Sequence, residues 1–394
     1  MEPGRKPSSE NHRMEFLEWK HHIESLERMD GFQPLEKDQA KEALTYLQKV
    51  LGDDFFYRAS AGDRCVARHP MLQLLANFPP CSRRCIARFA RCLRILEGSP
   101  NLDKVLARLD DITQFDHDAL VIKLAAKLVG EGLRARFEPT MEVKNNQRQP
   151  DLRLDDPFTG ETVFLEVVTQ GPAQMAREAT DASSAVFNTV FGISFNLCIS
   201  GRWYKTPSKQ VLVAIVEKIK GSAVRALNER TIVFVQEEDT LEMALCHADK
   251  KAHLLDPWCK ERGLSCGFLG PRIRRNDTVR LKRKMRDEQN QLPRDNANVI
   301  VILAADAFLG LGGVRRVIGE VEEGVLKYDH VHLVIVHGEH IDDRAVPFTG
   351  HDGDHRYTCR IVDGTVENDL LLLNRNSRIK LSPNLLEKFC QVFQ

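Results

Sequence analysis

Two strand-like segments joined by a tight turn constrain the fold of this chain more than any other feature. Residues 150–154 read PDLRL and residues 162–169 read TVFLEVVT. The linker DDPFTGE carries Pro157 and Gly160, which suit the ends of a tight turn. The sequence therefore predicts a β-hairpin at this point of the chain.

The hairpin brings two acidic residues together. With the turn centred on the linker, antiparallel pairing places Leu154 opposite Val163 and Asp151 opposite Glu166. Opposed Cβ atoms lie about 5 Å apart, where like charges destabilise a sheet unless a cation or a shared proton compensates. Two carboxylates with a backbone carbonyl and waters suit Mg²⁺, which can activate water in phosphodiester hydrolysis.

A second interpretation of the hairpin needs no metal. The acidic side chains could simply face water on a half-exposed strand, with Arg153 neutralising Glu166 diagonally. The register also matters, because a slip of one residue would put the two carboxylates on opposite faces of the sheet.

The segments around the hairpin predict a mixed α/β chain. Residues 1–114 read as helical, with one apolar stripe that ends at Gly52 and another that follows Pro80. A helix over 116–132 and a strand over 133–137 precede the hairpin. After it we expect strands at 192–199, 231–236, 298–306 and 330–337, a helix with Thr206 as N-cap and Pro207 in its first position, and a helix over 314–325.

This order of helix, strand, PD, hairpin, Glu-x-x and helix, over residues 115–236, resembles the PD-(D/E)xK, or restriction-endonuclease-like, nuclease superfamily. Pro150 and Asp151 match the PD, and Glu166 matches the acidic position. The resemblance implies a mixed sheet core flanked by helices. It also implies Mg²⁺ or Mn²⁺ bound by Asp151, Glu166 and the Val167 carbonyl, with DNA as the partner.

The sequence departs from this family where a lysine should assist the attacking water, because Val168 occupies that position. Valine can neither orient water nor offset the charge that develops on the phosphate. A cation from Lys144, Arg153 or Lys205 could replace the lysine, or Gln170 could orient the water. Spacing does not choose among these residues.

A helix before the core often supplies a further acidic residue in this family, and Asp116 and Asp118 stand at that place. The simpler interpretation is that both carboxylates begin a helix, where they favour the positive end of its dipole.

Residues 272–286, RIRRNDTVRLKRKMR, are strongly basic although the whole chain has a formal net charge of +0. A helix starting near Asp277 would bury Leu281, Met285 and Leu292. Its basic face suits nucleic-acid phosphates, and the alternative is a solvated face without a partner. The residues of this face are Arg280, Lys282, Arg283, Lys284 and Arg286.

Other clusters carry weaker signals. Neither the histidines of 330–340 nor GHDGDH at 350–355 has a recognised metal-ligand spacing, so ordinary hydrogen-bonded histidines are favoured. The cysteine pairs Cys81/Cys85 and Cys259/Cys266 are read as small core residues rather than zinc ligands. GLGG at 310–313 lacks the third glycine of a dinucleotide site.

We expect three regions: an α-helical domain at 1–114, a nuclease-like core at 115–236, and an α/β extension at 237–394 with the basic helix packed on the core. The leading hypothesis is a DNA-directed, metal-dependent endonuclease. The first rival keeps the fold as an inactive pseudo-nuclease that binds nucleic acid or acts as a scaffold, for example in bacterial defence or repair. The second is an α/β interaction protein unrelated to nucleases.

Location and assembly are less constrained by the sequence. No apolar run reaches the ~18 residues of a membrane span, no secretory signal is visible, and the 10 cysteines form no compact disulfide pattern. We therefore expect a cytoplasmic protein without a membrane partner. A homodimer or a partner protein stays open.

Overall fold

The computed structural model divides the chain into two compact units. Unit 1 comprises Met1–Gln170 and Asp277–Gln394, and unit 2 comprises Gly171–Asn276, so unit 2 is an insertion in unit 1. The structure describes residues 17–28, 33–60, 69–76, 80–143, 146–169, 174–194, 196–264, 268–269, 277–303, 322, 324–340, 348–352, 355–362 and 365–393.

Unit 1 begins with helices, as the sequence predicts. In α3, Gln33 and Glu36 form a reciprocal capping box, and the helix ends at Gly52, whose φ of +91° costs a glycine little. The helices are α2 (Trp19–Ser25), a 3₁₀ turn (Leu26–Arg28), α3 (Pro34–Leu51), α4 (Phe55–Ala59), α5 (Pro70–Ala76), α6 (Pro80–Ile95), α7 (Leu102–Leu106) and α8 (Phe115–Gly130).

A mixed eight-stranded sheet follows, in the order β1-β4-β5-β10-β11-β14-β13-β12. β5, β10 and β11 are mutually parallel, and every other neighbouring pair is antiparallel. The strands are β1 (Arg134–Phe137), β4 (Leu152–Asp155), β5 (Thr162–Thr169), β10 (Ala297–Leu303), β11 (Val331–His340), β12 (Phe348–Asp352), β13 (His355–Val362) and β14 (Thr365–Leu373). Unit 1 also holds the small β2 (Met141–Val143) and β3 (Asn146–Arg148) pair, α12 (Asp277–Glu288), the 3₁₀ turn Gln289–Gln291 and α14 (Pro383–Val392).

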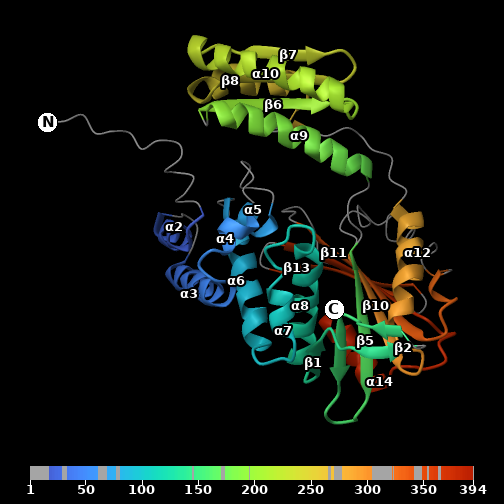
Figure 1. Ribbon diagram of the computed structural model, residues 1–394. Helices are drawn as coiled ribbons and strands as arrows, with labels where there is room; N and C mark the ends of the chain where they lie inside the picture. The colour runs from blue at the N-terminus through green and yellow to red at the C-terminus, as the bar shows by residue number, and fades with distance from the viewer. Residues whose placement is uncertain are drawn as a thin grey trace. The chain divides into compact units, whose positions relative to one another are not determined.

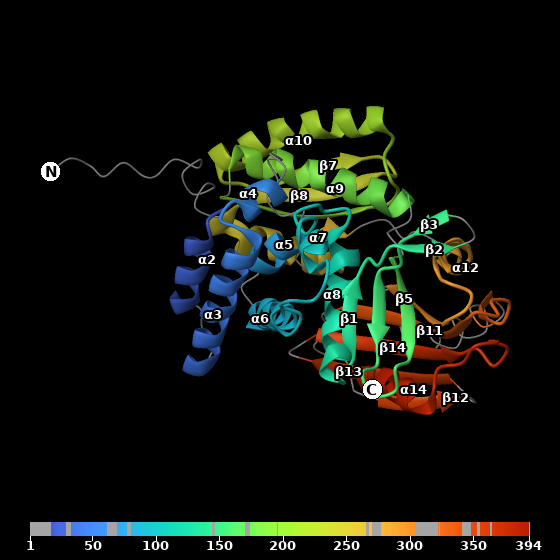
Figure 2. The same cartoon turned by 60° about the horizontal axis from the view of Figure 1, so that its bottom comes forward.

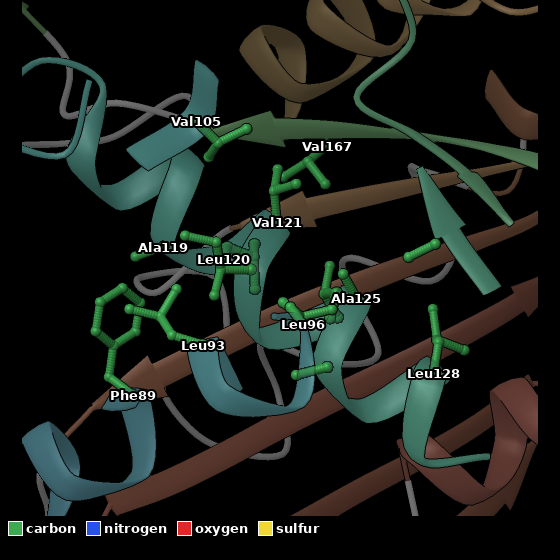
Figure 3. Close-up of a cluster of buried hydrophobic side chains, with 14 of the residues drawn as sticks. Phe89, Leu93, Leu96, Val105, Ala119, Leu120, Val121, Ala125, Leu128 and Val167 are labelled. Carbon is green, nitrogen blue, oxygen red and sulfur yellow. The ribbon is translucent and has the colours of Figure 1, made fainter. Parts of the chain in front are cut away.

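Helices cover both faces of this sheet (Figures 1 and 2). On one face, Leu165 and Val167 of β5 join a core that includes α6 and α8, and Figure 3 shows Val167 beside Val121 of α8. On the other face, Phe164 and Val168 pack in a second cluster with Met285 of α12. A mixed α/β core flanked by helices is therefore confirmed.

The structure divides the chain differently from the predicted boundaries at 114/115 and 236/237. The helices before residue 114 share one hydrophobic core with the sheet. The chain leaves the sheet after β5, forms unit 2, and returns through α12 to β10, which pairs with β5. Pairing between strands so far apart in sequence is not encoded in any local pattern.

Unit 2 has a four-stranded sheet in the order β7-β8-β6-β9, and α9 and α10 share a core with one face of it. The predicted strand at 192–199 begins only at Leu197, and Gly192 and Ile193 belong instead to the end of α9. The predicted helix is capped by Ser208, whose Oγ accepts from the Val211 N–H, rather than by Thr206. The elements are α9 (Gln174–Ile193), β6 (Leu197–Trp203), α10 (Lys209–Glu229), β7 (Val233–Glu237), β8 (Leu241–His247), a 3₁₀ turn (Ala248–Lys250), a π turn (Lys251–Leu255), α11 (Asp256–Glu261) and β9 (Phe268–Leu269).

Near the C-terminus, β10 and β11 were predicted and β12, β13 and β14 were not. In β14 the charged residues Glu367 and Asp369 occupy buried positions. The sequence therefore lacks the alternation of apolar and polar residues by which a half-buried strand is recognised. Most of the predicted helix over 314–325 lies outside the described residues.

Candidate active site

The carboxylate hairpin has the predicted register. β4 and β5 are antiparallel, and Leu154 lies opposite Val163. Continuing the ladder one step beyond its first pair places Asp151, the residue before β4, opposite Glu166. The side chain of Asp151 is anchored there, because its Oδ2 accepts a 2.6 Å hydrogen bond from the backbone N–H of Val167.

The side chain of Glu166 is buried, and its hydrogen-bonding capacity is not fully satisfied within the described residues. It is 7% exposed, and within the described part of the chain its Oε2 has no hydrogen-bond partner. Burial raises the pKa of Glu166 well above its usual value, and the charges of Asp151 and Glu288 raise it further, while a hydrogen bond with the Asp151 backbone opposes the rise. A buried carboxylate with an unsatisfied oxygen is costly, and a cation would relieve the cost.

Two residues that were not predicted, His117 and Glu288, join this site. His117, in the first turn of α8, lies with Nε2 3.0 Å from Asp151 Oδ1. Burial alone would lower the pKa of His117, but the hydrogen bond to Asp151 and the charge of that carboxylate outweigh burial and raise it. Burial raises the pKa of Glu288, the last residue of α12; the Lys284 charge opposes this rise and the Asp151 charge adds to it.

A sequence signal existed for one of these two residues. His117 stands in the DHD run at the start of the helix that precedes the hairpin. Glu288 has no such signal, because only the packing of α12 on the sheet brings it near the hairpin.

The other charged residues considered for this site have separate roles. Arg153 does not neutralise the buried carboxylate, because its Nε pairs with Asp155 at 2.9 Å along its own strand. Asp118 is buried and pairs with Arg108 at 3.0 Å, so it does more than begin a helix. Asp116 is exposed in the first turn of α8, where a carboxylate favours the positive end of the helix dipole.

The position of the family lysine is filled by an apolar side chain. Val168 is 1% exposed and packs in the cluster that contains Phe164 and Met285. This burial is what the pseudo-nuclease hypothesis requires.

The other residues offered as substitutes for that lysine stay predictions. Lys144 and Gln170 lie outside the described residues, and Lys205 belongs to unit 2.

Val167 contributes its backbone N–H to Asp151, and its side chain is buried in the core.

The basic helix is confirmed as α12. Met285 and Leu292 are buried, as predicted. Arg283, Lys284 and Arg286 are exposed, and Lys282 is half-buried. The side chains of Arg280 and Leu281 lie outside the described residues.

Three histidines near the C-terminus have hydrogen-bond partners within the protein. His330, His332 and His337 are buried rather than at the surface; the first two bond to backbone groups, and His337 Nδ1 lies 2.7 Å from Asp369. GHDGDH at 350–355 spans the end of β12, residues outside the described part, and the start of β13. Over the described ranges, no three or more His, Cys, Asp or Glu side chains form a group that could hold a metal ion.

The remaining motifs add no ligand site. Cys259 is buried in an apolar cluster of unit 2, and Cys85 is half-buried on α6, which agrees with their prediction as packing residues. The side chains of Cys81 and Cys266, and residues 310–313, lie outside the described residues.

Comparison with models of protein families, with curated proteins and with solved structures finds no match for this chain. No helix in the described ranges has both the length and the apolar character that crossing a membrane requires.

Proposed function

We propose that unit 1 carries a metal-dependent phosphodiesterase centre of the nuclease type, in which Asp151 and Glu166 hold Mg²⁺ or Mn²⁺ and DNA is the substrate. The observation that supports this most is the buried Glu166 Oε2, which has no partner in the described part of the chain and lies in a site shared with Asp151. The resemblance of the hairpin to PD-(D/E)xK nucleases points to the same chemistry.

The donor set fits a hydrated ion better than a closed protein cage. Mg²⁺ usually takes one or two carboxylates and keeps several waters. Each oxygen of Asp151 already has one hydrogen-bond contact, and a carboxylate oxygen has two lone pairs, so one direction per oxygen is left. Asp151 and Glu166 would hold the ion, with the Val167 carbonyl as a third ligand. The bound ion would activate water and stabilise the leaving oxygen.

DNA is favoured as the substrate by the position of α12. Its exposed residues Arg283, Lys284 and Arg286 lead along the helix to Glu288, whose charge acts on the buried carboxylate site. Cations that neutralise phosphates release condensed counterions, so such a helix can position a duplex beside the site.

Replacing Arg283, Lys284 and Arg286 together by alanine should therefore weaken DNA binding and its salt dependence. If each residue contacts one phosphate, the slope of log K against log salt should become shallower by about 0.9 per contact. Fluorescence anisotropy with a labelled duplex at several salt concentrations measures the slope. A control with the exposed Lys20, Lys49 and Lys104 replaced removes the same charge and should leave the slope near that of the parent. An equal loss in both variants would argue against α12 as the DNA surface.

The burial of Val168 supports a second function, a pseudo-nuclease that binds DNA without cutting it. In that case the carboxylates hold no catalytic ion, and the family lysine has been replaced by a packing residue.

A cleavage assay separates the two functions. We expect the full chain to cut plasmid or single-stranded DNA with Mn²⁺ or Mg²⁺, and EDTA to stop cutting because it removes the ion that activates water. Cleavage unaffected by EDTA would contradict the metal centre. DNA binding without cleavage at any metal concentration would favour the pseudo-nuclease.

A further inference from the structure

The carboxylate of Asp151 is held from two sides by groups on different elements. Its Oδ2 accepts from the backbone N–H of Val167 in β5 at 2.6 Å. Its Oδ1 lies 3.0 Å from Nε2 of His117 in α8. Asp151 lies one residue before Leu152, where the pairing of β4 with β5 begins. Pairing within the sheet therefore does not by itself fix the orientation of the Asp151 side chain.

We propose that His117 is the positioning residue of the metal centre and orients Asp151 for the ion. This inference rests on the proposed function, and it assigns to His117 a role that neither the hairpin motif nor the missing lysine indicates. An ionised carboxylate only accepts hydrogen bonds, so Nε2 of His117 donates to Oδ1. Residues that hydrogen-bond to metal ligands fix their orientation, and losing one typically weakens metal binding about 10- to 100-fold.

The surroundings of His117 suit a fixed donor. Its side chain is 20% exposed, so it is held mostly inside the protein rather than moving in solvent. The next residue in the helix, Asp118, is buried and paired with Arg108, which anchors this turn of α8. Together these contacts hold the imidazole against Oδ1 and leave the free lone pairs of Asp151 for a ligand.

Calorimetric titration of the full chain with MnCl₂ tests the proposal without depending on turnover. The variants are His117→Ala, His117→Gln and His117→Asn, with Asp151→Asn as the ligand control. Glutamine can place its amide near the position of Nε2, whereas asparagine is too short to do so. Asp116→Ala changes the preceding, exposed residue in the same helical turn and serves as the matched control. Thermal unfolding of each variant verifies that it is folded.

We expect His117→Ala and His117→Asn to weaken Mn²⁺ binding about 10- to 100-fold. His117→Gln should restore affinity to near that of the parent, and Asp116→Ala should bind as the parent does. If His117→Ala binds Mn²⁺ like the parent while Asp151→Asn does not, the positioning role is wrong and the metal centre stands. If the parent itself binds no Mn²⁺, the metal centre is wrong, and the role of His117 falls with it.

Discussion

Replacing Glu367 by glutamine is expected to lower the free energy of unfolding of unit 1 by about 3–5 kcal/mol, the usual cost of breaking a buried ion pair from one side. Glu367 lies on β14 and is 4% exposed. It accepts from Arg88 of α6 at 3.1 Å, from Lys127 of α8 at 3.0 Å and from Arg360 of β13 at 2.7 Å. One carboxylate thus joins the N-terminal helices to the far half of the sheet.

A glutamine cannot replace this carboxylate. Its amide carries no charge, and only one of its two polar atoms accepts hydrogen bonds. Arg88 and Arg360 keep second partners, Glu339 at 2.8 Å and Asp369 at 3.0 Å. Lys127 has no second ion pair within the described residues, so the loss should concentrate where α8 meets β14.

The pH dependence of stability tests the same contact. Burial alone would raise the pKa of Glu367, but the charges of Lys127, Arg360 and Arg88 outweigh burial and lower the pKa to about 2. The folded pKa is therefore below the unfolded value of about 4.3. The stabilisation is present above the unfolded pKa and is lost as pH falls towards the folded pKa. Glu367→Gln should lose this acid-dependent component.

Urea unfolding of the parent and the variant, from pH 7 to pH 3, measures both effects. Glu42→Gln is the matched control, because Glu42 forms an exposed pair with Arg94 at 2.7 Å. Such surface pairs contribute at most about 1 kcal/mol. If the two variants lose similar stability, the network around Glu367 does not hold the helices to the sheet.

Replacing Glu166 by glutamine should have opposite effects on function and on stability. Removing one of two protein carboxylate ligands should lower Mn²⁺ affinity and metal-dependent cleavage at least about 100-fold, since even a supporting residue costs about 10- to 100-fold. At neutral pH the same change should raise the unfolding temperature, because burial beside Asp151 and Glu288 disfavours the ionised form that Glu166 adopts freely in the unfolded chain, and glutamine does not ionise.

The sign of the stability effect follows from the raised pKa of Glu166. The folded pKa is above the unfolded value, so the stabilising contribution of this group is present below the unfolded pKa of about 4.3 and is lost as pH rises through the folded pKa. Glutamine does not ionise in this range. The difference in unfolding temperature between Glu166→Gln and the parent should thus be small near pH 4 and grow towards neutral pH.

Differential scanning fluorimetry over this pH range, without metal, measures the stability effect separately from activity. The exposed Glu42→Gln again serves as the control and should show no such growth with pH. A variant that is less stable than the parent at pH 7 would contradict a Glu166 side chain whose ionisation is disfavoured by burial. A variant that still cuts DNA like the parent would contradict Glu166 as a metal ligand.

The sequence alone determines several local elements of this protein. The apolar stripe that ends at Gly52, the DHD-containing helix α8, the hairpin of β4 and β5 and the basic helix α12 all follow from periodicity, turn residues and capping. These signals depend on residues that are neighbours in the sequence. The turn between β4 and β5 also sets the register of the hairpin, so the approach of Asp151 to Glu166 could be predicted.

The tertiary structure alone decides which distant elements meet. Pairing of β10 with β5 makes unit 2 an insertion, and packing of α8 and α12 on the two faces of the sheet brings His117 and Glu288 to the carboxylates. The buried charges of β14 are compatible with a strand only because α6, α8 and β13 supply their counterions. Such contacts result from packing between remote segments, for which a single sequence contains no local pattern.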